Sequence, residues 1–294
     1  MKQDSNLLPK TISDRYELYK QEKLWGQSSS KKGLYIDKKT DTLVFIKINT
    51  NGKSLFREYE YQRLFYEQSK KLKTTNIVIP KPLKILKVDN YVALVMEYLP
   101  AKSLLKVDVE TRLDVYMKVL KFLEKVNTMN DFSKKNGLIQ KPSTVHLMTL
   151  PYFLSRNLLI YFPYASLFLH SAGLITGVAP QWLKLTSNWM CHGDINVTNI
   201  LLYKKKIVIL DFAYALRSHR YFDISRALNS TWYQKGFHQQ LWKRILSEFR
   251  FTVHQKDLLK SFVIFNLMQR LSQRYTDVNQ ELFYLRRLEE LTSS

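Results

Sequence analysis

A short polar stretch between residues 191 and 228 contains side chains that could handle phosphate chemistry. Asp194 is followed five residues later by Asn199, and Asp211 comes directly after the apolar run 207–210. Charged groups beside a strongly apolar strand cost several kcal/mol unless something binds them. The two carboxylates and the amide therefore indicate a metal–phosphate site more readily than a requirement of folding.

Phosphoryl transfer from a nucleoside triphosphate needs metal ligands, neutralisation of the phosphate charge, and a carboxylate that orients the acceptor hydroxyl and takes its proton. Asp194 is the candidate for the carboxylate that acts on the acceptor. Asn199 and Asp211 offer hard oxygen ligands of the kind that Mg²⁺ prefers, with water and phosphate oxygens completing the metal's shell.

Lys47 is the candidate cation for the α- and β-phosphates of ATP. It lies inside the β-branched run 42–48, where a lysine either faces solvent or is held inward for an anion. The following helical pattern, 54–73, carries Glu58 and Glu60, either of which could hold this lysine. The two glutamates are two residues apart and so lie on different faces of a helix, and the sequence leaves the choice between them open.

A stretch of small residues precedes these elements, between a predicted strand at 22–25 and another at 34–36. Such a hairpin tip could lie over a ligand, and an ordinary turn explains the composition equally well. The candidate residues in this loop are Gly26, Ser28, Ser29 and Ser30.

The pattern changes at the end of a predicted strand pair, 83–87 and 91–96. Glu97 and Leu99 follow directly, and helical periodicity begins beyond Pro100. This change predicts an α+β chain with a first domain at 1–98, rich in strands, and a mainly helical second domain at 99–294.

One window of the helical part, 158–183, carries no charge except that of a histidine, and 132–193 contains no acidic residue. A transmembrane span is the alternative interpretation of that window. Proline and glycine interrupt it, so we expect buried helices, with a membrane-facing patch as the lesser alternative. Three amphipathic helices are expected to close the chain, at 238–251, 256–275 and 280–291.

The chain has 294 residues, of which 45% are hydrophobic, enough for a substantial core. Lys and Arg number 46 against 25 acidic residues, and the resulting charge of +21 favours anionic partners. The basic residues are dispersed and follow no nucleic-acid-binding motif, which disfavours a nucleic acid as partner. Cys191 is the only cysteine, and the first twenty residues lack an apolar signal segment, so residence in the cytoplasm is expected.

Several motifs occur together in an order that resembles the aminoglycoside phosphotransferase and choline kinase family, whose members are relatives of protein kinases. The matching segments are His192-Gly193-Asp194-x4-Asn199, Ile209-Leu210-Asp211-Phe212, Phe222-Asp223-Ile224, Met96-Glu97-Tyr98-Leu99-Pro100 and Phe45-Ile46-Lys47. The resemblance implies a two-lobed protein-kinase-like fold, with a small antiparallel-sheet N-lobe that carries one helix and a larger, mainly helical C-lobe.

The resemblance also implies a role for each matched position. Asp194 would be the catalytic base, Asn199 and Asp211 the magnesium ligands, and Lys47 the contact to the triphosphate. The loop 26–33 would cover the phosphates of ATP, and the backbone of 97–99 would meet its adenine. The structural positions would be His192 and Asp223, which would brace the catalytic loop.

The chain departs from protein kinases in ways that bear on its substrate. Serines occupy the phosphate loop, no activation-loop punctuation follows Asp211, and residue 213 is Ala rather than Gly. We therefore predict an ATP- and Mg²⁺-dependent kinase that phosphorylates a hydroxyl of a small molecule or glycan. A sugar or cell-envelope saccharide is favoured over a polycationic aminoglycoside because the chain is strongly basic, and choline or another amino alcohol is a further option.

Two features of this hypothesis stay open on the sequence. A catalytically silent nucleotide-binding scaffold with the same fold is the rival from another functional class. The uncharged window 158–183 would also permit contact with the inner face of a membrane. The residues do not determine the acceptor, the oligomeric state or a preference for ATP over GTP.

Overall fold

The computed structural model describes residues 10–21, 30–50, 52–72, 76–88, 90–129, 143–185, 187–231, 236–273 and 278–293. The chain folds into two compact units, the first made of 1–103 with 200–215 and the second of 104–199 with 216–294. The sequence pattern predicts a boundary after residue 98 and places 200–215 in the second domain. These residues join the first unit because the hairpin that they form pairs with strands of that unit.

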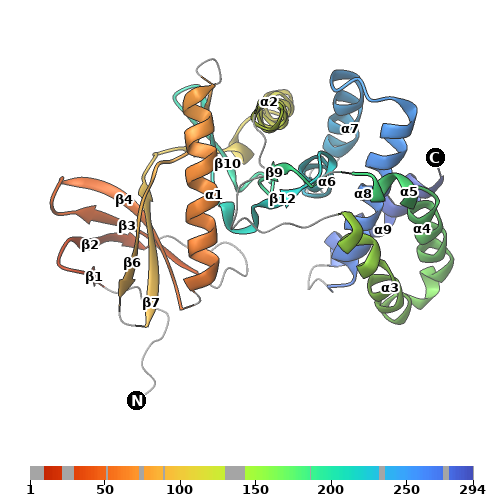
Figure 1. Cartoon of the computed structure of the whole chain (residues 1–294), viewed down its shortest axis with the longest axis horizontal. Coiled ribbons are helices and arrows are strands. Elements are labelled where there is room, and N and C mark those ends of the chain that lie inside the picture. Colours follow the sequence, from red (N-terminus) through yellow and green to blue (C-terminus); the bar gives the residue numbers. More distant parts are fainter. Residues whose placement is uncertain are drawn as a thin grey trace. The chain divides into compact units, whose positions relative to one another are not determined.

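The first unit contains an antiparallel six-stranded sheet (Figure 1). Its strands, in spatial order, are β1 (Thr11–Ile12), β2 (Tyr16–Gln21), β3 (Lys31–Asp37), β4 (Thr42–Asn49), β7 (Tyr91–Glu97) and β6 (Pro82–Val88). Alternate residues of β4 serve its two faces, since Ile46 and Ile48 are buried in one apolar cluster and Phe45 packs in another. Lys47 lies between them in sequence and therefore shares the face of Phe45.

Helix α1 (Gly52–Lys71) packs on the sheet along β6 and β7. Its buried positions include Leu55, Glu58, Gln62 and Phe65, which recur at the three- and four-residue spacing of one helix face. The helix can start this close to β7 because residue 52 is glycine: a Cβ there would lie 2.7 Å from a methyl carbon of Val92.

A second sheet of the first unit holds the apolar run at its centre. Its strands, in order, are β5 (Ile77–Val78), β11 (Lys206–Ile209), β10 (Ile200–Tyr203) and β8 (Lys102–Ser103). Residues 207–209 of β11 are buried, and the short helix η3 (Phe212–Tyr214) follows directly. Asp211 thus stands at the point where a buried strand ends.

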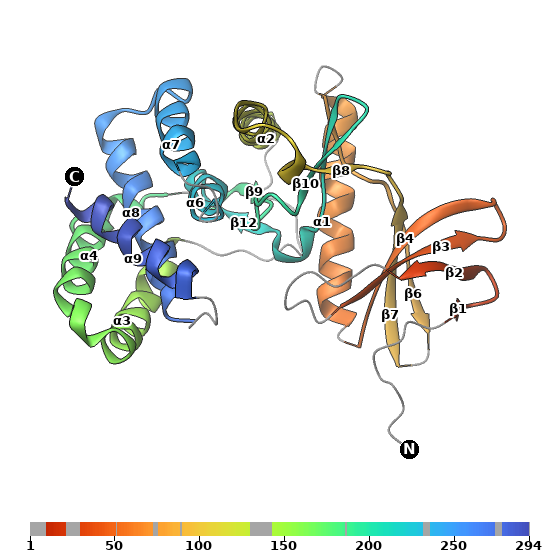
Figure 2. The same cartoon turned by 180° about the vertical axis from the view of Figure 1, so that it is seen from behind.

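The second unit is mainly helical (Figure 2). Its elements are η1 (Leu104–Lys106), α2 (Val109–Thr128), α3 (Ser143–Ile160), η2 (Phe162–Tyr164), α4 (Ala165–Gly177), α5 (Ala179–Leu183), β9 (Trp189–Cys191), β12 (Leu216–Ser218), α6 (Tyr221–Asn229), α7 (Phe237–Glu248), α8 (Val253–Leu271) and α9 (Val278–Ser293). Helix α8 is the centre of this unit, since it is buried over most of its length and contacts α3, α4, α6 and α9.

No helix in the described part of the chain combines the length and the apolar character needed to cross a membrane. The uncharged window 158–183 spans the end of α3, all of η2 and α4, and α5, which agrees with several short helices. Only one side of these helices is buried. Phe168 and Ile175 are fully enclosed, whereas Leu159 and Phe162 are 85% and 78% exposed.

Candidate active site

Lys47 points inward from β4 and is 4% exposed. Its ammonium group forms ion pairs with Glu58 of α1 and with Oδ1 of Asp211, at 3.0 Å from the latter. Burial lowers the pKa of Lys47, but the two carboxylates outweigh this effect and hold the pKa above its ordinary value. The lysine is therefore a buried, charged group held for an anion, which was one of the two alternatives that the sequence left open.

The structure selects Glu58 as the glutamate that holds Lys47. Glu58 lies on the buried face of α1 and is 2% exposed. Burial raises its pKa, and the charge of Lys47 offsets only part of this rise. Glu60, the other candidate, points into solvent and pairs with Arg63 at 2.8 Å, because two residues along a helix turn a side chain to a different face.

Asp211 adopts a left-handed backbone conformation, with φ of 64°, directly before η3. Aspartate tolerates this region better than most residues with a side chain. The following turn is anchored to α1, since Arg57 donates a hydrogen bond to the carbonyl oxygen of Ala213 and the rings of Phe65 and Phe212 are 5.0 Å apart. The carboxylate is thereby fixed beside the ammonium group of Lys47.

A second lysine, which sequence reasoning did not single out, reaches the same carboxylate. Lys32 of β3 places Nζ 3.1 Å from Oδ2 of Asp211, while Lys47 contacts Oδ1. Burial acts to raise the pKa of Asp211, but the two lysines outweigh it, so that this pKa lies well below its ordinary value. Asp211 is therefore ionised at neutral pH.

In the second unit, backbone hydrogen bonds hold together the loop around Asp194. The buried carboxylate of Asp223, on α6, accepts the N–H groups of His192 and Gly193, both at 2.8 Å. Gly193 has φ of 83°, a conformation that a residue with a side chain adopts only under strain. Burial raises the pKa of Asp223, while His192 and the two N–H donors act to lower it.

Asp194 and Asn199 are neighbours within this loop. The amide nitrogen of Asn199 donates to the carbonyl oxygen of Asp194 at 3.0 Å and to its Oδ2 at 2.8 Å. The backbone N–H of Asp194 also donates to Nδ1 of His192 at 3.2 Å. The half-buried carboxylate of Asp194 is thus oriented from two sides.

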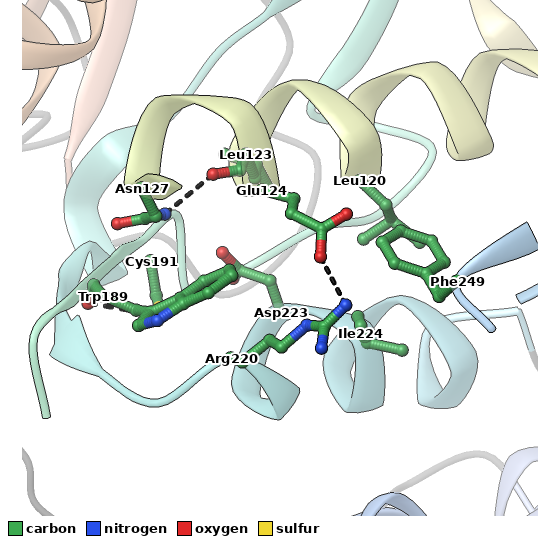
Figure 3. A pocket seen from close by; sticks show the side chains of 10 residues that line it. All are labelled: Leu120, Leu123, Glu124, Asn127, Trp189, Cys191, Arg220, Asp223, Ile224 and Phe249. Carbon is green, nitrogen blue, oxygen red and sulfur yellow. Dashed lines mark hydrogen bonds and ion pairs between the residues drawn. The ribbon is translucent and has the colours of Figure 1, made fainter. Parts of the chain in front are cut away.

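Helix α2 contacts β9, the strand that leads into this loop, and contributes residues to a cavity there (Figure 3). Asn127 donates to the carbonyl oxygen of Met190 at 3.0 Å and accepts the Met190 N–H at 2.6 Å, which ties α2 to β9. The space below it is a cavity of about 10 Å³, about enough for one water molecule. Its lining residues are Leu120, Leu123, Glu124, Asn127, Trp189, Cys191, Arg220, Asp223, Ile224 and Phe249. Two of these lining residues, Arg220 and Glu124, form an ion pair with each other.

Glu97 and Leu99 lie where β7 ends. The N–H of Glu97 donates to the carbonyl oxygen of Lys81 at 2.9 Å, and its carboxylate accepts the Lys81 N–H at 3.0 Å. Both residues line a groove of about 410 Å³ whose other lining residues are Tyr66, Ser69, Lys70, Leu72, Ile77, Val78, Ile79, Tyr203 and Lys206. The expected adenine contact at 97–99 stays a prediction.

Gly26, Ser28 and Ser29 of the expected phosphate loop lie outside the described residues. Ser30 is described and accepts a hydrogen bond from the amide nitrogen of Asn49 at 3.0 Å. This bond joins the start of β3 to the end of β4, so the chain that leaves the loop is fixed beside the strand that carries Lys47.

The donor groups fit the expectation of a magnesium ion. Asp211 supplies an ionised carboxylate, and the Asn199 amide nitrogen is engaged by Asp194, which leaves its oxygen as the acceptor atom. Among the described residues, no group of three or more His, Cys, Asp or Glu side chains could hold a metal. Mg²⁺ is usually bound by one or two carboxylates, with phosphate oxygens and water completing its shell.

Lys32 and Asn127 are the site residues that sequence reasoning missed. The available signal for Lys32 was a lysine pair at the start of a strand after a loop of small residues, and for Asn127 an amide at the end of a long helix. Neither signal is specific, because lysine pairs and helix-terminal amides are common on solvated surfaces.

Residues 52–249 match the model of a family described as a phosphotransferase enzyme family. A comparison with curated proteins found no match. Among solved structures, a thermostable mutant of an aminoglycoside phosphotransferase in a ternary complex with ADP and hygromycin B is similar over 94% of both chains, with a TM-score of 0.71 at 10% identity. A choline kinase from Streptococcus pneumoniae is similar over 94% of both chains, with a TM-score of 0.56 at 14% identity.

An amicoumacin kinase in complex with AMP-PNP, Ca²⁺ and Ami is similar over 96% of this chain and 89% of that chain, with a TM-score of 0.62 at 11% identity. At such identities the likeness concerns the fold. The predicted α+β, protein-kinase-like fold is confirmed, since these kinases share both the antiparallel sheet and the helical part.

Proposed function

The chain belongs to the phosphotransferase enzyme family, and from this premise we propose that it transfers the γ-phosphoryl group of ATP, with Mg²⁺, to a hydroxyl group of a sugar or cell-envelope saccharide. Membership in the family makes it a kinase that acts on small molecules. The observation that carries the finer proposal is that buried Lys47 and Glu58 lie with half-buried Asp211, so that a cation for phosphate and an ionised carboxylate for metal are held side by side.

Each residue has a role in this proposal. Lys47 binds the α- and β-phosphates, and Glu58 keeps its ammonium group charged and in place. Asp194 orients the acceptor hydroxyl and takes its proton as the phosphoryl group arrives. Asp211 and Asn199 hold Mg²⁺, which when bound neutralises charge on the phosphate oxygens.

The surrounding residues position these groups. His192 and Asp223 brace the loop that presents Asp194, through the hydrogen bonds described above. The loop that contains Gly26, Ser28, Ser29 and Ser30 covers the phosphates. The backbone near Glu97 and Leu99 meets the adenine ring.

The choice of acceptor follows from charge. The aminoglycoside hygromycin B and choline are associated with two of the similar kinases, and the aminoglycosides carry several positive charges. This chain has a net charge of +21 and no acidic residue between 132 and 193, in the unit that carries Asp194. A polycation would be repelled by such a surface, whereas neutral sugars and anionic saccharides would not.

An acceptor screen tests the function. ATP consumption with Mg²⁺ should be measured over sugars, sugar phosphates, cell-envelope saccharides, amino alcohols and aminoglycosides. We expect turnover with a saccharide, and a loss of about a thousandfold or more in kcat for Asp194→Asn, with ATP binding unchanged because Asp194 acts on the acceptor. Asp257→Ala, on the exposed side of α8, is the matched control.

Two outcomes would contradict the proposal. Equal turnover in Asp194→Asn and the natural chain would remove Asp194 from the mechanism. Stabilisation by ATP and Mg²⁺ in a thermal-shift titration, without turnover on any acceptor, would favour the rival, a catalytically silent nucleotide-binding scaffold.

We further propose that the exposed side of α3, η2 and α4 contacts an anionic membrane surface at the cytoplasmic face. The apolar side chains there are Met148, Tyr152, Leu159, Phe162 and Leu169, each more than half exposed. Arg156 lies among them, and no acidic residue occurs in 132–193. Apolar side chains beside an arginine fit the interface of an anionic bilayer, where a membrane-bound saccharide acceptor would also lie.

Vesicle sedimentation tests this contact. The chain should bind vesicles that contain phosphatidylglycerol and should not bind pure phosphatidylcholine. Leu159→Ser combined with Phe162→Ser should weaken binding, whereas Val253→Ser should not, although Val253 is also exposed in the same unit. Unchanged binding in the double variant, or a concentration-dependent dimer that the double variant abolishes, would overturn the proposal.

A further inference from the structure

Lys32 and Lys47 are direct partners across two neighbouring strands. The register of β3 and β4 sets Lys32 opposite Lys47 and Lys31 opposite Ile48. Residues opposite each other in an antiparallel pair point to the same face of the sheet. Lys31 therefore points to the opposite face, toward the cluster that buries Ile48, and only Lys32 joins Lys47.

Each of the two lysines contacts a different oxygen of the Asp211 carboxylate. Lys32 contacts Oδ2 of Asp211 at 3.1 Å and Lys47 contacts Oδ1 at 3.0 Å. With Glu58, the group contains two cations and two anions and is neutral as a whole. Two ammonium groups this close to each other repel unless anions separate them, so the arrangement depends on Asp211.

The two lysines differ in how firmly they are held. The Lys47 side chain is 6% exposed and has two carboxylate partners, whereas the Lys32 side chain is 24% exposed and forms its ion pair with Asp211. A lysine has a flexible stem and a compact charge, so Lys32 can turn to a new anion without unfolding its strand. The hydrogen bond between Ser30 and Asn49 keeps the start of its strand in place.

We propose that Lys32 is a second phosphate-binding cation, and that its ion pair with Asp211 engages the carboxylate oxygen that a metal ion would take. When a nucleoside triphosphate and a divalent cation bind, Asp211 exchanges Lys32 for the metal, and Lys32 moves to the phosphates. The proposal rests on the proposed function for the identity of the ligand. It adds a phosphate contact from β3 and a competition between an ammonium group and a metal for one carboxylate.

Nucleotide binding without metal tests the phosphate contact. Dissociation constants for ATP, ADP and AMP should be measured by calorimetry in the presence of a chelator. We expect Lys32→Met to weaken ATP binding by about tenfold or more, ADP binding less, and AMP binding least, since the charge-assisted contact is to the outer phosphates. Lys32→Arg should retain most of the affinity, and Lys31→Met, which removes the same charge from the other face, should bind as the natural chain does.

Metal binding without nucleotide tests the competition. Mn²⁺, as a paramagnetic stand-in for Mg²⁺, should bind Lys32→Met several times more tightly than the natural chain, because Oδ2 of Asp211 is then released. Lys31→Met should not change the Mn²⁺ affinity, and Asp211→Asn should abolish it. These readouts need no acceptor and no turnover.

The outcomes separate this proposal from the proposed function. Equal affinities of Lys32→Met and the natural chain for ATP, or an equal loss for ATP and AMP, would overturn the role of Lys32 and leave the kinase assignment standing. Unchanged Mn²⁺ affinity in Lys32→Met would overturn the competition for Asp211. A natural chain that binds no nucleotide at all would overturn the proposed function and this inference together.

Discussion

The two units hold their polar residues by different forces. In the first unit, Lys47, Glu58, Asp211 and Lys32 are joined by ion pairs between side chains. In the second unit, the loop around Asp194 is held largely by hydrogen bonds from backbone N–H groups. In the first unit the partners of the carboxylates are lysines, which a charged ligand could take over.

This difference suits two different tasks. Ion pairs redistribute when a charged ligand arrives, because a phosphate can replace a carboxylate as the partner of a lysine. A carboxylate that accepts two backbone N–H groups fixes the chain itself, so the loop keeps its geometry whether or not a ligand is bound. We infer that the ion pairs of the first unit rearrange when a charged ligand binds, whereas the hydrogen bonds of the second unit keep Asp194 in position.

The largest effect should come from breaking the first arrangement at Lys47. Lys47→Met leaves the buried Glu58 and the half-buried Asp211 without their shared cation. Loss of one partner of a buried pair is strongly destabilising, so we expect a loss of stability of about 3–5 kcal/mol and a decrease in kcat/KM of about a hundredfold or more. Urea denaturation and steady-state kinetics measure both effects, with the exposed Lys39→Met as control.

In the second unit, replacement of Asp223 should remove the hydrogen bonds that hold the loop around Asp194. Asp223→Ala leaves the N–H groups of His192 and Gly193 buried without their acceptor. Each unsatisfied group costs about 1–3 kcal/mol, and we expect a total of about 2–4 kcal/mol in urea denaturation. Asp257→Ala should stay within about 0.5 kcal/mol, because Asp257 is exposed. A loss of activity without a loss of stability would instead give Asp223 a direct catalytic role.

A smaller effect, on ATP affinity, should show which of the two glutamates matters for nucleotide binding. Glu58→Gln keeps the shape of the side chain but removes the charge that pairs with Lys47, so we expect ATP affinity to fall by about tenfold. Glu60→Gln removes the same charge from the exposed face of α1 and should change affinity less than about twofold. Calorimetry of both variants is the measurement, and equal effects would show that the ion pair with Lys47 does not matter for binding.

The sequence predicts which residues belong to the candidate site better than it predicts which of these residues contact each other. The spacing of Asp194, Asn199 and Asp211 was readable because each follows a local pattern along the chain. The choice of Glu58 was not readable, since it depends on which face of α1 packs against the sheet. The role of Lys32 depends on the register of two strands joined by a turn, which no single residue specifies.

The fold shows the same contrast: features that depend on neighbouring residues follow the sequence prediction, and a feature that depends on residues far apart in the chain does not. Most helices and strands follow the expected ranges, because periodicity and turn residues are local signals. The assignment of 200–215 to the first unit depends instead on pairing of β11 with β5, across more than a hundred residues of chain. Pairing over such a separation leaves no local signal in the sequence.

The smallest expected effect is on the pH dependence of stability, to which Asp211 and Asp223 should contribute with opposite signs. The lysines lower the pKa of Asp211, so its contribution to stability is present above about pH 4, the ordinary unfolded value, and is lost as the pH falls further. Burial raises the pKa of Asp223, so its ionisation costs stability as the pH rises from about 4 through that raised value.

Urea denaturation between about pH 3 and pH 7 should therefore give opposite slopes for two matched variants. The stability difference between the natural chain and Asp211→Asn should grow with rising pH at the acidic end. The difference between the natural chain and Asp223→Asn should shrink with rising pH, because the variant has no carboxyl group to ionise. Each unit of difference between the folded and the unfolded pKa contributes about 1.4 kcal/mol. Slopes of the same sign would contradict the opposite pKa shifts of Asp211 and Asp223.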